Sequence, residues 1–254
     1  MVKAVQGGAE PGYGPTEQGC RANGELTSVT TPLGHLTQWG YNVLGVKTSR
    51  TDALGRLTTY TLDGWNRVTT STYPDSMTKT VIYDADSNTT AFTDATGTTA
   101  RTFDADNRLL SESKDGSTVV SHTYDAAGRR ASRTSGGVTT NFLFDGGAVL
   151  LEQQGGNTTA TYTYSNSLIR KDGETPLFDG LGSERTVTNS GQGVMGSLTL
   201  SAFGQSVASS GSSTSAYQYG ATSGYRSDGD AGLTQVGCRF YDAQVGRYFA
   251  VNLP

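Results

Sequence analysis

The sequence predicts an all-β fold, an array of short antiparallel β-hairpins with a repeat of about 21 residues. Two observations predict it: a turn motif recurs in register along the chain, and the segments between the turns are rich in strand-forming residues. A hydrophobic content of 34% also fits a sheet that covers a modest core on one face only.

The turn motif is clearest at residues 124–130, which read YDAAGRR. Asp125 suits the first position of a type I turn, because its carboxylate can accept hydrogen bonds from backbone N–H groups two and three residues ahead. Gly128 suits the site after the two central residues, where φ is positive and a Cβ is disfavoured. The motif therefore predicts a three-residue hairpin loop that ends in a G1 bulge.

This motif recurs at steps of about 10 or 21 residues, and degenerate members around Asp75 and Asp115 fill the longer steps. Its leading Asp or Asn occupies positions 42, 52, 63, 84, 94, 104 and 125. Two turns per 21 residues indicate an internal repeat array. The residues predicted to build these turns are Asp52, Gly55, Asp84, Asp94, Gly97, Asp104, Asp125 and Gly128, with positive φ at the three glycines.

The segments between the turns read as strands, for example RVTTSTY from Arg67, MTKTVIY from Met77 and TTATYTY from Thr158. No window sustains the apolar period of a helix over about 10 residues. We expect an irregular leader at 1–23, which contains Pro11 and Pro15, a repeat array at 24–155 and a further region at 156–254. In that last region the stretch ASSGSSTSA from Ala208 predicts a surface loop or a flexible linker.

Neither a signal peptide nor an apolar segment of membrane-spanning length is recognisable, so we expect no membrane span in this chain. The net charge of −4 and the absence of a Lys/Arg cluster argue against a nucleic-acid partner. Cys20 and Cys238 are interpreted as buried free thiols, with a disulfide between them as the alternative.

Residues typical of catalysis or metal binding are few. His35 and His122 are expected in the middle of strands with structural roles, because neither has a second ligand at metal-binding spacing. Phosphate-binding loops and nucleophile elbows are absent from the sequence. Arginines 56, 67, 108 and 129 follow turns and are expected to form ion pairs with Asp across the sheet. We therefore predict a protein that is not an enzyme and needs no cofactor or metal.

The repeats resemble the RHS, or YD, repeats of toxin-complex shell subunits and teneurins. PLFDGLGSERTVTNSGQGV from Pro176, LSAFGQSV from Leu200 and GYRSDGDAGLTQVGCRFYDAQVGRYF from Gly224 are similar to the RHS-associated core region. The positions that match its signature are Gly232, Leu233, Arg239, Phe240, Tyr241, Asp242, Gly246, Arg247 and Tyr248.

The resemblance implies a bacterial protein, extracellular or at the cell surface. In proteins of this family the repeat array spirals into a hollow shell or tube around a toxic polypeptide, and the core region plugs or lines one end. Self-cleavage in this family depends on an aspartate just after the core. Asn252 stands at the expected place, so this activity is not carried over to the present chain.

Three functions remain open at this level. The first is a shell-forming structural protein that encloses or presents a polypeptide cargo in a secreted toxin or surface protein. The second is a self-assembling protein whose copies pair end to end into tubes or filaments. The third is a module that binds carbohydrate or a cell surface, with surface glycans stacking on Trp39, Trp65 and Tyr162; cross-strand packing is the alternative for these aromatic rings.

Overall fold

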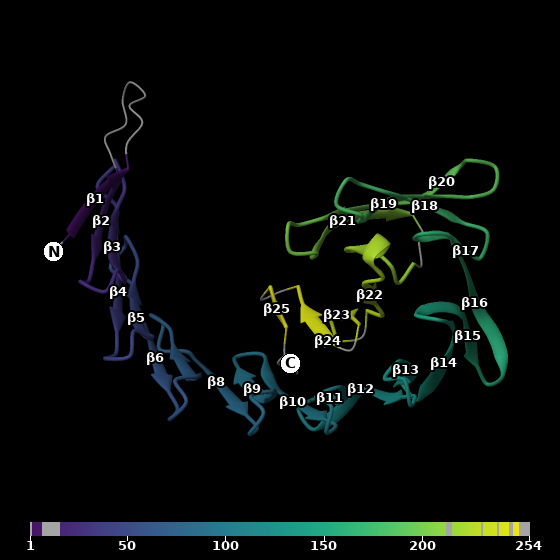
Figure 1. Cartoon of the computed structure of the whole chain (residues 1–254), viewed down its shortest axis with the longest axis horizontal. Coiled ribbons are helices and arrows are strands. Elements are labelled where there is room, and N and C mark those ends of the chain that lie inside the picture. Colours follow the sequence, from purple (N-terminus) through teal and green to yellow (C-terminus); the bar gives the residue numbers. More distant parts are fainter. Residues whose placement is uncertain are drawn as a thin grey trace. The chain divides into compact units, whose positions relative to one another are not determined.

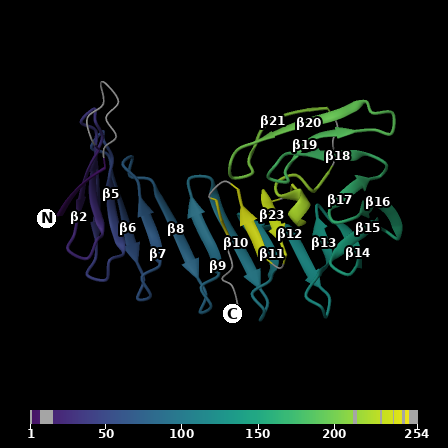
Figure 2. The same cartoon turned by 45° about the horizontal axis from the view of Figure 1, so that its top comes forward.

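The computed structural model describes residues 2–6, 16–211, 215–229, 231–237, 239–243 and 246–248, with no side chains for 2–6. The chain forms two compact units (Figures 1 and 2). Unit 1 comprises residues 1–82 and 92–98, and unit 2 comprises residues 83–91 and 99–254. Asn252, Cys238, Pro11 and Pro15 lie outside the described residues.

Unit 1 is a row of strands in which each strand pairs antiparallel with the next, from β1–β2 to β7–β8. Its strands are β1 (Val2–Gln6), β2 (Thr16–Cys20), β3 (Leu26–Thr30), β4 (Leu36–Tyr41), β5 (Lys47–Thr51), β6 (Leu57–Leu62), β7 (Val68–Thr72) and β8 (Thr78–Tyr83). β9 (Thr89–Asp94) contains residues of both units. No described side chain of unit 1 is buried.

Unit 2 continues the same antiparallel pairing from β10–β11 to β16–β17. These strands are β10 (Gly97–Phe103), β11 (Leu109–Lys114), β12 (Ser117–Tyr124), β13 (Arg130–Ser135), β14 (Val138–Asp145), β15 (Ala148–Gln154), β16 (Asn157–Tyr164) and β17 (Leu168–Lys171). The predicted all-β array of short hairpins is confirmed. Its closing into a hollow shell or tube remains a prediction.

Two further four-stranded antiparallel sheets complete unit 2. The first contains β18 (Thr175–Phe178), β19 (Glu184–Thr188), β20 (Val194–Leu200) and β21 (Ser206–Gly211). The second contains β22 (Arg226–Ser227), β23 (Leu233–Val236), β24 (Arg239–Asp242) and β25 (Arg247–Tyr248), and it follows the single 3-10 turn η1 (Ala221–Ser223). Because β21 includes residues 208–211, the first part of the stretch expected to be a loop or linker is a strand.

Two classes of turn connect the strands. In the five-residue class the first N–H donates to the fifth C=O, as from Asp52 to Arg56 at 3.1 Å. The fourth N–H donates back to the first C=O, as from Gly55 to Asp52 at 2.9 Å. In unit 1 this class begins at Arg21, Thr31, Asn42, Asp52, Asp63 and Tyr73. In unit 2 it begins at Asp84, Asp104, Asp125, Asp179, Asn189 and Ser201. Two-residue turns such as Asp115–Gly116 and Gly136–Gly137, whose φ values are all positive, connect other strands of this unit.

The core lies in unit 2, where the described residues between 215 and 248, here called the C-terminal segment, pack on the repeat strands. One cluster joins Phe142, Val149, Ala160, Tyr162 and Leu168 of the repeats with Tyr217 and Ala221. A second joins Leu109 of β11 with Leu233 and Phe240. Figures 1 and 2 show β22–β24, in yellow, next to the strands β11–β13.

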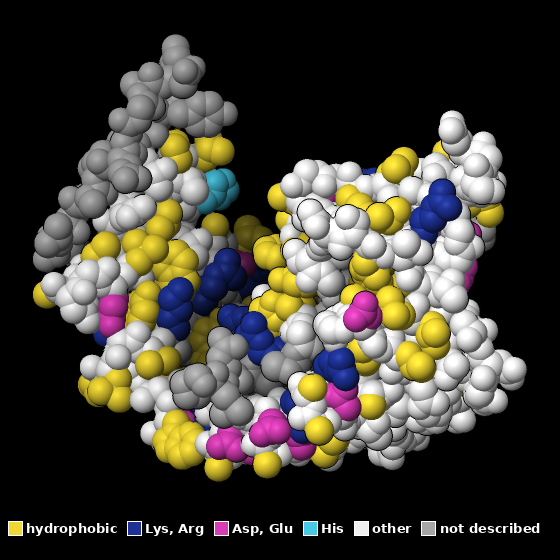
Figure 3. Space-filling model, turned by 45° about the vertical axis from the view of Figure 1, so that its right-hand side comes forward, with side chains coloured by type: hydrophobic (Ala, Val, Ile, Leu, Met, Phe, Trp, Pro, Cys, Tyr) yellow, Lys and Arg dark blue, Asp and Glu magenta, His cyan; other side chains and the backbone are white. Residues whose placement is uncertain are grey.

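Much of the surface that Figure 3 draws is uncharged. Figure 3 shows that polar uncharged side chains and backbone, in white, make up much of the face it draws. This agrees with a composition in which only 17% of residues are charged. In the interior of unit 2, by contrast, charged side chains form specific pairs.

Candidate functional site

The turn aspartates and glycines lie where the motif places them. Gly55 and Gly128 have φ of 76° and 78°, and Gly97 has φ of 116°, as the motif predicts. The Asp94 turn is tighter than the others, because Asp94 ends β9 and Gly97 begins β10. Asp94 still accepts a hydrogen bond from the Thr96 N–H at 2.8 Å.

One detail of the expected turn is wrong. The Asp125 carboxylate accepts from the N–H groups of Ala127 and Arg129, two and four residues ahead, both at 2.9 Å. The N–H three residues ahead, on Gly128, donates instead to the Asp125 carbonyl oxygen at 2.9 Å. The same geometry holds at Asp52 and Asp104.

The arginines that follow the turns pair within their own turn rather than across the sheet. Arg129 Nε donates to Asp125 Oδ2 at 2.7 Å, and Arg56, Arg67 and Arg108 pair with Asp52, Asp63 and Asp104 in the same way. The fifth residue lies beside the first in this loop, so the ion pair is local. Backbone and guanidinium donors of Arg129 hold the pKa of the Asp125 carboxyl below its usual value.

Each repeat is also tied to the next one through the aromatic residue that precedes the Asp, a role that the motif did not reveal. The Arg108 guanidinium lies 4.8 Å from the ring centre of Tyr124, and that of Arg129 lies 4.9 Å from that of Phe144. The Tyr124 hydroxyl donates to the Leu109 carbonyl at 2.8 Å. In unit 1 the Tyr41 hydroxyl donates to Leu26 at 2.6 Å.

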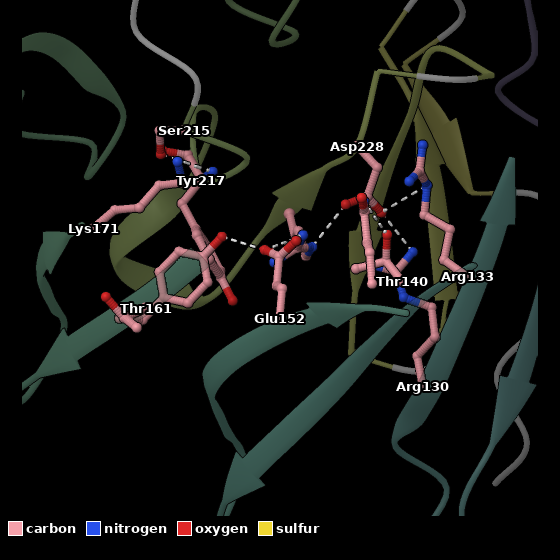
Figure 4. A network of polar contacts seen from close by, with 12 residues as sticks. Arg130, Arg133, Thr140, Glu152, Thr161, Lys171, Ser215, Tyr217 and Asp228 are labelled. Carbon is pink, nitrogen blue, oxygen red and sulfur yellow. Dashed lines mark hydrogen bonds and ion pairs between the residues drawn. The ribbon is translucent and has the colours of Figure 1, made fainter. Parts of the chain in front are cut away.

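The main candidate site is a network of buried charges that joins the C-terminal segment to the repeat strands (Figure 4). Asp228 Oδ2 lies 2.6 Å from Arg130 Nη1 and 4.0 Å from Arg133 Nε, both on β13. Arg226 Nε binds Asp228 Oδ1 at 2.8 Å, and Arg226 Nη2 binds Glu152 Oε1 of β15 at 2.8 Å. Arg226 thus binds one carboxylate of its own segment and one of the sheet.

Aromatic rings lie beside the two buried guanidinium groups of the network. Arg130 and Arg226 each lie 4.7 Å from the centre of the Phe142 ring, and Arg226 lies 5.4 Å from that of Tyr217. The Tyr162 hydroxyl donates to Glu152, and its ring packs edge-on against Tyr217 at 5.4 Å. Desolvation makes these charges costly unless they are paired, so the network favours one position of the segment over others.

Burial and pairing act in opposite directions on the charges of this network. Burial raises the pKa of the Asp228 carboxyl, but Arg130 and Arg226 outweigh it and hold that pKa well below its usual range. Burial lowers the pKa of Arg226, but Asp228 and Glu152 outweigh it and raise it well above its ordinary value. Both groups are therefore charged at neutral pH.

His122 lies beside this network on β12 and is buried against the C-terminal segment. Its ring stacks on Phe240 at 5.1 Å. Burial, reinforced by Arg130, lowers the pKa of His122 to about 3, so the ring is neutral in the folded protein. His35, in contrast, ends a turn and precedes β4, so its expected mid-strand position is wrong. The described residues contain no group of three or more His, Cys, Asp and Glu side chains arranged to hold a metal ion.

The residues of the core signature take up positions around the second cluster. Gly232 has φ of 68° just before β23, and Leu233 is buried against Leu109. The Tyr241 hydroxyl donates to the Phe203 carbonyl at 3.0 Å, and Asp242 accepts from the Gly246 N–H at 2.8 Å. Gly246 has φ of 66°, the Arg239 guanidinium lies 4.2 Å from the Tyr248 ring centre, and Arg247 is an exposed residue of β25.

The three aromatic residues considered for glycan stacking do not form one surface. Tyr162 is 5% exposed, so the expectation that it faces solvent is wrong. Trp39 is half-buried beside Lys47, and Trp65 is exposed beside Arg67 of the same turn. Cys20 is a half-buried free thiol. Among the described residues no helix has the length and hydropathy needed to cross a bilayer.

Comparison with known proteins agrees with the repeat geometry. The RHS repeat family model matches residues 48–76 and 103–139, which span the turns at Asp52, Asp63, Asp104 and Asp125. The chain contains RHS repeats. The matched segments contain the Asp–Arg turns described above in both units.

Two Bacillus proteins are relatives of this RHS-repeat chain. It is 26% identical over 245 residues to the tRNA3(Ser)-specific nuclease WapA of Bacillus spizizenii, covering 84% of this chain and 10% of the relative. It is 30% identical over 151 residues to the tRNA nuclease WapA of Bacillus subtilis, covering 50% of this chain and 6% of the relative. The chain thus spans a tenth or less of the length of these relatives.

Solved structures of toxin complexes also align with the RHS-repeat chain. A crystal structure of TcdB2–TccC3 aligns with 93% of this chain and 20% of that chain, at 12% identity and a TM-score of 0.33. The Photorhabdus luminescens Tc holotoxin pore aligns with 95% of this chain and 20% of that chain, at 11% identity and a TM-score of 0.36.

Proposed function

We propose that this chain is a non-catalytic structural wall that encloses or presents a polypeptide cargo in a secreted toxin or surface protein. The observation that supports it most is the charge network, in which Arg226 and Asp228 of the C-terminal segment bind Glu152 and Arg130 of the repeat strands. Repeat strands alone expose a broad face. A segment fixed on that face by buried charges is what a wall with a lined or plugged interior requires.

The small share of the relatives that this chain matches fits this assignment. They are named tRNA nucleases, yet this chain corresponds to a tenth or less of their length. In this chain turn aspartates such as Asp125 bind backbone N–H groups and arginines, and the network carboxylates Asp228 and Glu152 bind arginines. We assign no catalytic residue, and we place the repeat array at 24–155 and the core-like region at 156–254 outside the cell or at its surface.

A protease-protection experiment tests the wall function. An unstructured, protease-sensitive polypeptide is fused after Pro254, and its digestion is compared with that of the same polypeptide alone. Slower digestion of the fused polypeptide, lost in the Asp228→Ala variant, is the expected result. Equal digestion of the fused and free polypeptide would overturn the proposal.

The non-catalytic part of the proposal has its own test. Purified chain is incubated with total tRNA, with or without divalent cations, and the RNA is examined for cleavage. We expect intact tRNA. Cleavage that co-purifies with the chain through several columns would contradict the assignment.

Assembly with further copies is a second candidate, favoured by β21. This strand is the outer member of its sheet, all six of its residues are exposed, and its sequence SVASSG contains no charge or proline. Native proteins usually protect an edge strand with charged residues or proline. Light scattering over a concentration series, with Ser209→Lys as the blocking variant, tests whether chains pair through β21; a monomer at every concentration excludes it.

A further inference from the structure

A second feature of unit 2 is a cavity beside the charge network, here called the arginine pocket. Its volume is about 370 Å³. Three arginines, two phenylalanines and a tyrosine contribute to its lining, and none of the described residues that line it is Asp or Glu. These six are Arg129, Arg130, Arg226, Phe142, Phe144 and Tyr217.

The carboxylates of the network lie on its other side. Glu152 and Asp228 line a neighbouring cavity together with Arg133, and Arg226 is the one guanidinium that lines both cavities. The carboxylate partners of Arg130 and Arg226 therefore line the other cavity, whereas Arg129 pairs with Asp125 of its own turn. Such an arrangement attracts an anion more strongly than an exposed arginine does, because the surroundings are partly desolvated.

Two buried guanidinium groups in its wall retain donor capacity. Arg130 is 2% exposed and Arg226 is 6% exposed. Arg130 Nε and Arg226 Nη1 have no hydrogen-bond acceptor among the described residues, and both are buried from solvent, so a ligand in the pocket reaches them once the guanidinium groups turn toward it. Buried donors of this kind normally have an acceptor, and a carboxylate is the acceptor whose geometry suits a guanidinium group.

The remaining wall selects for an apolar group next to the charge. Phe142, Phe144 and Tyr217 supply aromatic surface, and Val149 adds an aliphatic side chain. A free phosphate would leave this surface uncovered. An aromatic side chain followed by an acidic residue in a peptide offers both the ring and the carboxylate within the available volume.

We propose that the arginine pocket binds an acidic residue of a polypeptide together with a neighbouring aromatic side chain. The inference deepens the proposed function and rests on it, since the peptide is taken to come from the cargo that the wall encloses. The pocket then holds one point of the cargo against the inner side of the repeat strands.

The chain offers a matched pair of variants for testing the site. Gly147 lines the pocket, an added Cβ meets no atom within 4 Å, and its φ is not in the left-handed region. Gly180 has the same properties in a turn that does not line the pocket. Gly147→Leu fills the pocket and leaves every charge of the network in place, whereas Gly180→Leu is the control.

The binding measurement is calorimetric titration with two capped peptides, acetyl-Phe-Asp-amide and acetyl-Phe-Asn-amide, and with inorganic phosphate. We expect the Asp peptide to bind at least about tenfold more tightly than the Asn peptide, which lacks the charge. We expect Gly147→Leu to abolish this binding and Gly180→Leu to retain it. Phosphate should bind more weakly than the Asp peptide.

Three results would overturn the inference: equal affinity for both peptides, no effect of Gly147→Leu, or phosphate binding as tight as that of the Asp peptide. This failure is distinguishable from failure of the wall function. If no peptide binds but the fused polypeptide still resists protease, the pocket assignment is wrong and the wall proposal stands.

Discussion

Units 1 and 2 use the same strand-and-turn repeat but differ in what stabilises the strands. In unit 1 the five-residue turn connects strand after strand, and no described side chain is buried. In unit 2 two-residue turns occur as well as this turn, and the C-terminal segment packs on the strands and buries Phe142, Leu109 and Arg130.

The difference shows that the repeat defines local structure without supplying a core. Turn hydrogen bonds, in-turn ion pairs and strand pairing are present in both units. Burial of apolar area, the dominant stabilising term in folding, is concentrated in unit 2. Both tryptophans, Trp39 and Trp65, lie in unit 1, so tryptophan fluorescence reports on unit 1 alone.

The largest expected effect is in the charge network of unit 2. Asp228→Ala leaves Arg130 and Arg226 buried with one carboxylate fewer, and loss of one partner of a buried ion pair costs about 3–5 kcal/mol. Amide hydrogen exchange should rise in β13–β15 and in residues 215–229, while the urea midpoint of tryptophan fluorescence stays unchanged. Unchanged exchange in unit 2 would mean that the network does not hold the segment.

The next largest expected effect is a pH dependence of the stability of unit 2, which His122 causes and unit 1 does not share. The folded pKa of His122 is about 3, below its unfolded value of 6.5, so only the unfolded state gains this proton as pH falls between those values. Unit 2 should therefore lose about 1.4 kcal/mol of stability per pH unit from this residue below pH 6.5.

The variant His122→Phe isolates this contribution, because it keeps a ring to stack on Phe240. Its stability relative to the natural chain should rise as pH falls from 6.5 to 4.5, measured by hydrogen exchange of β12. Glu112, whose pKa burial raises, is present in both proteins and cancels. Parallel pH profiles would refute a neutral, buried His122.

A smaller effect tests the turn that both units share. Gly55→Val and Gly128→Val place a β-branched residue at φ of 76° and 78°, which costs roughly 1–3 kcal/mol in each unit. Gly55→Asn is the matched control, because Asn66 and Asn107 occupy the same turn position at φ of 61° and 57°. Equal effects of Val and Asn in urea unfolding would contradict a conformational cause.

The link between successive repeats should contribute less. Tyr41→Phe in unit 1 and Tyr124→Phe in unit 2 each remove one hydroxyl-to-carbonyl hydrogen bond, with an expected loss of about 0.5–1.5 kcal/mol. Tryptophan fluorescence should detect the first variant and hydrogen exchange of β12 the second. A much larger loss in one unit would show that the two bonds are not equivalent.

The smallest effect concerns a surface ion pair. The Arg56 side chain is 61% exposed in its pair with Asp52, so Arg56→Gln should leave the fluorescence midpoint of unit 1 within error, at low and at high salt. A clear shift at low salt that disappears in 1 M NaCl would show that the in-turn pairs stabilise the array after all.

The sequence by itself determined the repeat. The positions of Asp125 and Gly128 in YDAAGRR imply a tight loop, because Asp accepts hydrogen bonds from nearby N–H groups and Gly tolerates positive φ. These preferences act within five residues, so they are readable without a fold. The same locality explains the in-turn Arg129–Asp125 pair, once the fifth residue is placed beside the first.

Only the tertiary structure decided which charged and aromatic residues form a site. Arg130 and Arg226 are 96 positions apart in the sequence. In the sequence they look like ordinary surface residues, and so do their partners Glu152 and Asp228. No local preference brings them together. Their pairing depends on where the C-terminal segment lies on the strands, and it is the desolvation of that interface that makes one pairing stable over another.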